Sequence, residues 1–354
     1  AARHGTADHS AASHHTRAKA DRARAPTHRT ARHRVAGHFM TLTHSTPVST
    51  DLAVAHICFR AMSTEVNVTV VGGSPDLLDW AHQRIDQLEA RWSRFRPDSE
   101  ISQLNAASGH PLTVSDDTVL AVHTACAAAL LTRGRFDPTV HDSLLRLGYD
   151  DTIDVVRERF DDRSTPAGPI ATLPAPGCTG IVADPASRMV IVPADVRLDL
   201  GGIGKGLAAD LAAMGLIERG AAGALVNIGG DVRAIGHPAN GQRWQVAIDD
   251  PRTDGLAATV ALLDGGVASS STLRRRWRHA GVARHHLVAP SSGQSTSNDV
   301  VGVAVVAGTA AWADALSKVP FVDPYDDESF RVASALVFHA DGSTTVRGPV
   351  DLRV

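Results

Sequence analysis

The chain has 354 residues, with 35 lysines and arginines against 38 aspartates and glutamates, and therefore a formal net charge of −3. Hydrophobic residues make up 43% of it, which over this length can bury the core of one large domain or two modest ones. Aromatic residues make up only 4%. A nucleic-acid-binding body is disfavoured, because an acidic domain with few aromatic rings lacks both the basic patch and the stacking surface of that class.

The charge is distributed unevenly and separates a tail from a body. Residues 1–50 hold eight lysines and arginines against two aspartates, which gives this segment a net charge of about +6. The net charge of residues 51–354 is therefore about −9. Because the first segment shows no helical or strand periodicity, we expect a disordered His/Arg/Ala-rich extension over residues 1–55. This composition fits a solvated tail. It also fits a stretch that precedes a true start of the protein at Met40. Its eight histidines show no regular metal-ligand spacing.

Cysteine usage and the N-terminus bear on the cellular compartment. Cys58, Cys126 and Cys178 form no C-x-x-C pair, so neither a zinc site nor a disulfide framework is indicated, and small buried apolar residues are expected. No apolar run reaches the roughly 18 residues that a membrane span requires. The N-terminal region has no apolar signal segment and no cysteine of the lipoprotein type, so we expect a cytoplasmic protein.

The first half of the body predicts one strand and two helices. Residues 65–71 alternate apolar and polar side chains as a half-buried strand does. Apolar residues at helical spacing predict a helix over residues 76–94. Ser115 can cap a second helix over residues 116–131. A connection rich in proline and glycine follows over residues 161–178.

The second half interleaves further strands and helices. Strands are predicted over residues 190–200, 223–228, 244–248 and 300–306, and helices over residues 206–219 and 309–319. No repeat period is visible, so the residues from about 56 to 354 indicate one α/β or α+β body of the enzyme type.

The densest chemical signal is a glycine-rich turn, Asp199-Leu-Gly-Gly-Ile-Gly-Lys-Gly-Leu-Ala-Ala-Asp210. A strand ends on a carboxylate, glycines let the backbone approach a ligand closely, and Lys205 adds a mobile charge before a helix begins. The spacing matches neither a P-loop nor a dinucleotide-binding fingerprint. Two interpretations remain open: an anion or phosphate site, and a plain tight turn between a strand and a helix.

Three smaller features admit both structural and functional interpretations. Asn227-Ile-Gly-Gly-Asp231 predicts a hairpin turn. The pair His285-His286 is more typical of surface histidines than of metal ligands. Asp314 and Lys318 lie four residues apart on one face of the last predicted helix, which is the spacing of an ordinary ion pair.

Taken in this order, the motifs resemble one family, the ApbE-type flavin transferases (FAD:protein FMN transferases). The resemblance runs from about Phe59 to Val319 and rests on six ordered segments. They are Phe59–Glu65, Arg91–Asn105 (Arg-Trp-Ser-Arg-Phe-Arg-Pro-Asp-Ser-Glu-Ile-Ser-Gln-Leu-Asn), Phe136–Val140, Leu147–Asp150, Asp199–Asp210 and Val226–Arg233. The long second segment makes the match far more specific than a single glycine pattern.

The resemblance implies a fold and a chemistry. The fold is α+β, with mixed sheets and packed helices in a single body of two lobes over residues 56–354. The substrate is FAD, Mg²⁺ engages its pyrophosphate, and a threonine or serine hydroxyl of an acceptor flavoprotein attacks the FMN phosphorus, so that AMP leaves. Such a reaction depends mainly on positioning and on neutralising the charge of the phosphate oxygens.

The resemblance also implies site residues. It places Asp314 and His286 in catalytic roles. Contacts with FAD are implied for Met62, Phe95, Leu147, Gly148, Tyr149, Asp199, Lys205 and Val288. Metal ligation is implied for the position of Asp314 with the carbonyl of Gly202, and the neighbouring candidates are Ser317 and Lys318.

The metal-ligand segment departs from the family pattern. Lys318 stands where the family has a threonine ligand, and an ammonium group cannot ligate Mg²⁺. Ser317 is adjacent but is turned about 100° around the helix. Ala289 replaces an expected aspartate, and Ser269-Ser-Ser-Thr272 lacks an expected glycine. Two alternatives to flavin transfer therefore remain: an FAD-binding module without catalysis, and an FAD pyrophosphatase in which water replaces the acceptor hydroxyl.

Overall fold

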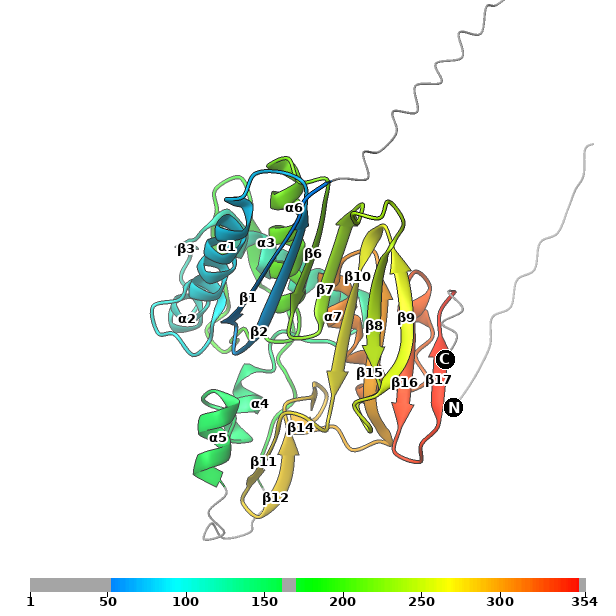
Figure 1. The fold of residues 1–354 in the computed structure, drawn as a ribbon. Helices are drawn as coiled ribbons and strands as arrows, with labels where there is room; N and C mark the ends of the chain where they lie inside the picture. The colour runs from blue at the N-terminus through cyan, green and yellow to red at the C-terminus, as the bar shows by residue number, and fades with distance from the viewer. Residues whose placement is uncertain (1–51, 161–169, 350–354) are drawn as a thin grey trace, which may run out of the picture. The chain divides into compact units, whose positions relative to one another are not determined.

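The computed structural model describes residues 52–160 and 170–349, which belong to one compact unit (Figure 1). Residues 1–51 of the extension predicted over residues 1–55, and residues 161–169 of the connection predicted over residues 161–178, lie outside the described residues. The first strand begins at Val54, inside the range predicted for the extension. No helix in the described ranges combines the length and the apolar character needed to cross a bilayer.

A large antiparallel sheet organises the fold. Its strands lie in the spatial order β1, β2, β6, β7, β10, β15, β16, β17 (Figure 1). Their bounds are Val54–Ala61, Thr64–Val71, Gly223–Ile228, Asp231–Gly236, Asp264–Ser271, Val300–Ala307, Ser334–His339 and Thr344–Arg347. Valine and alanine dominate these strands, and their inward side chains are almost fully buried, for example Val66, Val68, Val226 and Val305. A core poor in aromatic residues is therefore built from small branched side chains.

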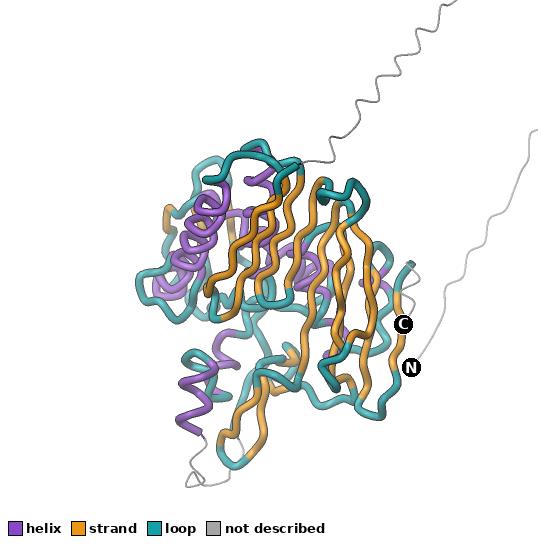
Figure 2. Tube along the Cα trace, viewed as in Figure 1, coloured by secondary structure: helices purple, strands orange, loops and turns teal. Residues whose placement is uncertain are grey.

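The two faces of this sheet are covered differently, and Figure 2 shows the helices gathered on one side of the strands. That face packs against α1 (Leu77–Trp92) and α6 (Gly204–Glu218), and α3 (Asp116–Leu131) joins the same apolar core through its contact with α1. The shorter α7 (Ala310–Leu316) continues the helical layer toward β10 and β15. The opposite face is covered by a hairpin of β8 (Trp244–Asp249) and β9 (Leu256–Leu262), whose alternate side chains are buried.

A smaller lobe lies beyond one end of the large sheet (Figure 1). It comprises α4 (His141–Arg146), α5 (Ile153–Phe160), β11 (Arg276–His279), β12 (Val282–His285), β13 (Val288–Ala289) and β14 (Gln294–Ser295). Its separate apolar core contains Leu144, Leu147, Tyr149, Val156 and Trp277. The predicted α+β class with two lobes is therefore confirmed.

The remaining elements are short. They are α2 (Glu100–Ala106), β3 (Leu112–Thr113), β4 (Val182–Asp184), β5 (Met189–Ile191), α8 (Val319–Val322) and a 3₁₀ turn at Glu328–Phe330. The three cysteines are free thiols. Cys126 and Cys178 are half-buried, but the prediction of a buried residue is wrong for Cys58, which points outward from the edge strand β1.

Two predicted elements end earlier than expected. The strand predicted over residues 190–200 stops at Ile191, because Pro193 follows and the side chain of Asn105 then takes the place of a neighbouring strand. Its amide exchanges hydrogen bonds of 2.8 and 2.7 Å with the carbonyl and N–H of Leu198. The helix predicted over residues 309–319 stops at Leu316, and a new helical turn begins with Val319 and Pro320.

The close approach of α6 and α7 requires a glycine and generates a stability prediction. A Cβ atom on Gly206 would lie 2.3 Å from the carbonyl oxygen of Ala310 and 2.8 Å from the nitrogen of Ala311. We expect Gly206→Ala to lower the free energy of unfolding by about 1–3 kcal/mol, because one of the helices must move. Urea denaturation measures this change.

Gly308→Ala is the matched control, because a Cβ atom there meets nothing within 4 Å. It should change the free energy of unfolding by about 0.5 kcal/mol or less. Equal stability of the two variants would show that the helices tolerate a methyl group at their crossing.

Candidate functional site

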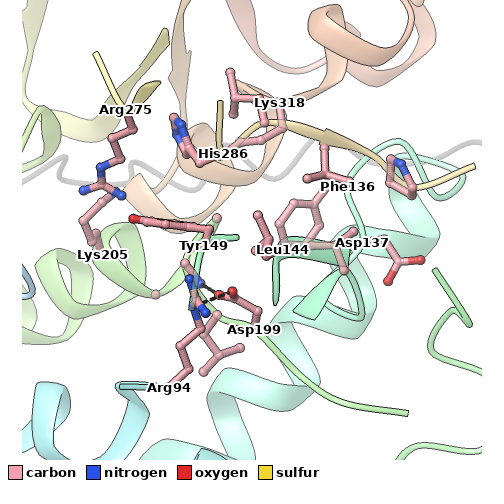
Figure 3. A pocket seen from close by; sticks show the side chains of 18 of the residues that line it. Arg94, Phe136, Asp137, Leu144, Tyr149, Asp199, Lys205, Arg275, His286 and Lys318 are labelled. Atoms are coloured by element: carbon pink, nitrogen blue, oxygen red, sulfur yellow. Dashed lines mark hydrogen bonds and ion pairs between the residues drawn. The ribbon is translucent and has the colours of Figure 1, made fainter. Parts of the chain in front are cut away.

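Most of the residues implied in flavin contact line a single cavity between the large sheet's helical layer and the small lobe (Figure 3). Those at the cavity are Met62, Phe95, Tyr149, Asp199, Lys205 and Val288. Two others do not line it. Leu147 is fully buried in the core of the small lobe, where its carbonyl accepts a 2.8 Å hydrogen bond from the indole of Trp277, and Gly148 follows it in a turn.

An arginine inside the long motif organises one wall of the cavity. The Arg94 guanidinium lies 4.2 Å from the ring centroid of Phe95 and 4.7 Å from that of Tyr149. Its Nε is 3.0 Å from Oδ2 of Asp199 (Figure 3). Tyr149 also stacks on Trp277, with ring centroids 5.0 Å apart. Nη2 of Arg94 is buried without a hydrogen-bond partner among the described residues, so one strong donor remains available to a ligand.

The glycine-rich turn has features of both structures that the sequence left open, a tight turn and an anion site. Asp199 closes it by accepting a 2.6 Å hydrogen bond from the N–H of Gly201. The turn leads directly into α6, which has no side-chain cap at its N-terminus. Gly201, Gly202 and Lys205 also line the cavity. The segment is therefore a tight turn that presents a helix N-terminus and a lysine to the cavity, an arrangement suited to phosphate.

Four buried charges meet beside this turn, from α6, β7, α7 and the residues just after α7. The Lys205 ammonium contacts the carboxylate of Asp231 and lies 3.7 Å from Oδ2 of Asp314. The Lys318 ammonium contacts Oδ1 of Asp314, so the predicted ion pair at positions i and i+4 is confirmed. The N–H of Gly206 donates a 3.3 Å hydrogen bond to Oδ2 of Asp314.

The two carboxylates of this cluster differ in acidity. Burial raises the pKa of Asp231 to about 6, and the neighbouring charge of Asp314 adds to the effect. Burial also opposes ionisation of Asp314, but Lys205 and Lys318 outweigh it and hold its pKa at about 2. Burial lowers the pKa of Lys318, which Asp314 only partly offsets, whereas the two carboxylates together raise the pKa of Lys205 despite its burial. Of the two carboxylates, Asp314 is therefore the one that ionises first as the pH rises.

A second cavity opens on the other side of these charges, along β10 and the β6–β7 turn. The side chains that line both cavities are Lys205, Arg275, His286 and Lys318, together with the backbone at Gly201. We call these four side chains the cationic neck; Figure 3 shows them around the first cavity. Beyond the neck the second cavity is lined by polar groups that include Asn227, Ser269, Ser270, Ser271 and Arg274.

His286 is the uncharged member of the neck. Burial and the nearby charges of Arg275 and Lys318 hold its pKa well below the usual value. Its Nδ1 is buried and has no hydrogen-bond partner among the described residues. The neighbouring His285 lines neither cavity, and its Nε2 lies 3.0 Å from the carbonyl oxygen of Thr296. The two histidines are therefore not a metal-binding pair.

Two tight turns border the cavities. Gly229 and Gly230 form the predicted hairpin turn between β6 and β7, with φ values of 62° and 96°. A Cβ atom on Gly229 would lie 2.4 Å from Oγ1 of Thr64. The turn from β1 to β2 has the same left-handed backbone at Met62 and Ser63, with φ values of 51° and 57°, although neither is glycine. Such backbone is uncommon for these residue types and is typical of functional sites.

The four residues named as metal candidates do not fit a divalent cation as they stand. Both oxygens of the Asp314 carboxylate are engaged, by Lys318, by Lys205 and by the N–H of Gly206. The Ser317 hydroxyl donates a 2.7 Å hydrogen bond to the carbonyl of Asp314, and it lines neither cavity. Gly202 does lie at the cavity. The described residues contain no group of three His, Cys, Asp or Glu side chains arranged to hold a metal.

Sequence reasoning missed several residues at the cavities, notably Arg94, Phe136 and Arg275. Arg94 and Phe136 stand inside the motifs that carry the resemblance, so the motifs themselves were a signal. Arg275 belongs to a run of three arginines, residues 274–276, in an otherwise acidic body. Such a run signals an anion site only when the fold brings it to a cavity.

Comparison with known proteins gives one consistent result. The model of the ApbE family matches residues 62–336. A protein of Haemophilus influenzae named FAD:protein FMN transferase is 28% identical over 265 residues, which cover 71% of this chain and 75% of the relative. A protein of Vibrio cholerae with the same name is 28% identical over 274 residues, which cover 74% of this chain and 79% of the relative.

A solved structure agrees. The crystal structure of an ApbE protein of Thermotoga maritima superposes with a TM-score of 0.70 at 27% identity. The superposition covers 84% of this chain and 97% of that protein. The shared architecture therefore includes both lobes.

The raised pKa of Asp231 gives a prediction about stability and pH. The native pKa of about 6 lies above the ordinary value of 3.8, so this group favours folding below about pH 4, and that contribution is lost as pH rises through 6. Asp231→Asn removes the titration. As the pH rises from about 4 to about 7.5, the free energy of unfolding of the Asp231→Asn variant should increase by up to about 3 kcal/mol relative to that of the parent protein.

Urea denaturation at several pH values measures this difference. Asp254→Asn is the control, because that side chain is 81% exposed and its carboxylate keeps contact with water in both states. The control's difference from the parent should stay constant over the same range. A constant difference for Asp231→Asn as well would contradict the assigned titration.

Proposed function

The chain belongs to the ApbE family, and from this premise we propose that it is an FAD:protein FMN transferase. In this proposal it binds FAD, transfers the FMN moiety to a threonine or serine hydroxyl of an acceptor protein, and releases AMP. The observation that carries the proposal is the meeting of two cavities at the cationic neck. An enzyme that transfers a phosphoryl-linked group must hold the donor and the acceptor together at one reacting phosphorus, and two joined cavities provide a place for each.

The first cavity suits the flavin donor. Phe95, Tyr149 and apolar side chains such as Val288 offer surface to a flat ring system. The Arg94–Asp199 pair places a donor and an acceptor of hydrogen bonds beside them. The N-terminus of α6 and Lys205 line the same cavity. A ligand with an aromatic end and an anionic centre matches this lining.

The cationic neck suits the pyrophosphate. Lys205, Lys318 and Arg275 converge there, and fixed positive groups stabilise the charge on phosphate oxygens during transfer. In the family such charge is also supplied by Mg²⁺, as the resemblance implies. The residues at Asp314 do not fit that ion as they stand, so no step of this proposal depends on it.

The second cavity suits the acceptor. In the proposed step an acceptor hydroxyl oxygen attacks the FMN phosphorus, the bond from that phosphorus to the AMP oxygen breaks, and AMP leaves with the bonding electrons. The hydroxyl proton goes to His286, which is neutral and lines both cavities. With water in place of the acceptor, the same geometry would give FMN and AMP by hydrolysis.

An assay of both products tests the proposal. The protein is incubated with FAD and a pooled library of peptides that contain serine or threonine. Fluorescent peptide and AMP should appear together in equal amounts. AMP without labelled peptide would instead identify an FAD pyrophosphatase, and bound FAD without either product would identify a binding module.

The two adjacent histidines supply a matched pair of variants. We expect His286→Gln to slow FMN transfer by about a hundredfold or more, because general-base catalysis is lost, while FAD binding persists. His285→Gln is the control, since His285 lines neither cavity, and it should transfer FMN nearly as fast as the parent protein.

Transfer by the parent protein should not fall as the pH decreases from 8 to about 6.5, because the pKa of His286 lies below that range. A stopped assay of labelled peptide measures the rate. Similar losses in both histidine variants would argue against a specific role for His286 as the base.

A further inference from the structure

We propose that the Lys318 ammonium is a built-in cation of the phosphate site, which takes up the oxygen ligands that a divalent cation would need, so that transfer proceeds without a metal ion. This inference rests on the proposed function for its reaction. The placement of the ammonium itself rests on contacts within the chain and can be tested separately.

The first observation is the set of oxygens around this ammonium. Nζ of Lys318 contacts Oδ1 of Asp314, donates a 2.8 Å hydrogen bond to the carbonyl oxygen of Asp314, and lies 3.2 Å from the Ser317 hydroxyl. A carboxylate, a carbonyl and a hydroxyl are the oxygen ligands that a hard divalent cation selects. Here they surround a nitrogen that carries a single charge.

The second observation is how rigidly these oxygens are held. Asp314 is fully buried in α7, and the N–H of Gly206 on α6 fixes Oδ2 of its carboxylate. The start of α7 is fixed in turn by Asp210, whose carboxylate accepts hydrogen bonds of 2.9 and 2.8 Å from the N–H groups of Ala310 and Ala311. The ammonium is thus preorganised by two helices, as an electrostatic catalyst requires.

The third observation is where the charge is directed. The Lys318 side chain is 16% exposed, and it lines both cavities at the neck. It contacts Oδ1 of Asp314, whereas Lys205 lies nearest to Oδ2 of the same carboxylate. A Cβ atom on Gly202 would come within 3.4 Å of Cε of Lys318, so the lysine lies against the glycine-rich turn. One buried carboxylate therefore holds two cations at the place where phosphate oxygens would lie.

These contacts exclude joint occupancy. A divalent cation on Asp314 would have to displace the Lys318 ammonium, because both oxygens of that carboxylate are already engaged. A metal ion beside both lysines would be a third cation at one carboxylate and would be repelled strongly. Neutralising the phosphate oxygens does not require a metal as such, because lysine and arginine serve the same purpose at phosphoryl groups. The lysine therefore supplies one positive charge in a fixed position.

A metal-binding measurement tests the placement without any assay of activity. Binding of Mn²⁺ is followed by electron paramagnetic resonance on the full chain, with and without FAD. The parent protein should bind no Mn²⁺ at millimolar concentrations, and Lys318→Thr should gain one site. Stoichiometric binding by the parent protein, or no gain in a folded Lys318→Thr variant, would overturn the proposal.

The same proteins are then assayed for FMN transfer. Transfer by the parent protein should be unaffected by a chelator and by added Mg²⁺. Without metal, the transfer rate of Lys318→Thr should be at least tenfold below that of the parent protein, and Mg²⁺ should restore it. Lys318→Met supplies neither a charge nor an oxygen ligand, so its transfer rate should fall as far and should not recover with Mg²⁺. Loss of transfer by the parent protein in chelator would contradict the inference.

The two failures are distinguishable. If the parent protein labels no peptide under any condition, the proposed transfer function fails, while the Mn²⁺ titration still decides whether Lys318 excludes a metal. If it labels peptide only with Mg²⁺, transfer stands and the built-in cation is wrong.

Discussion

The structure depends on one buried carboxylate and on what neutralises it. Asp314 has no exposed surface, and an unpaired charge in such a place would be strongly unfavourable. Lys205 from α6, Lys318 from just after α7 and a backbone N–H of α6 satisfy it. These contacts require α6 and α7 to approach closely, which only a glycine at position 206 permits. The packing of the helical layer and the placement of the cations therefore depend on the same close approach of α6 and α7.

That constraint also joins the fold to the chemistry. Because α6 begins at the glycine-rich turn and Lys318 follows closely after α7, holding the two helices together brings a helix N-terminus and two ammonium groups to the first cavity. The small lobe contributes Tyr149 to the lining, and that side chain packs in the lobe's own apolar core. The raised pKa of Asp231 reflects the same crowding, since burial disfavours its charged form and the ionised Asp314 nearby disfavours it further.

Local patterns predicted local structure well and long-range pairing poorly. The helix over residues 116–131 was predicted with the correct bounds. Its N-terminal cap is local in sequence, because the Ser115 hydroxyl accepts a hydrogen bond from the N–H of Thr118, only three residues further on. The strand predicted over residues 190–200 was too long, because its pairing partner became a side chain 93 residues away. Arg94 was missed for the same reason: its role depends on Tyr149 and Asp199, which no periodicity connects to it. The sequence did reveal Lys318 as a departure, but not the oxygens around it.

The scarcity of lysine shows why that departure is chemically specific. The chain has 35 lysines and arginines, of which only three are lysines, yet two of those three stand at the neck. Arginine is used where a planar group is needed, as at Arg94 between aromatic rings and a carboxylate. A guanidinium is too broad and too directional to fit among a carboxylate, a carbonyl and a hydroxyl of one helical turn. A compact ammonium on a flexible stem fits there, as a small metal ion would, and this suits lysine to the place of such an ion.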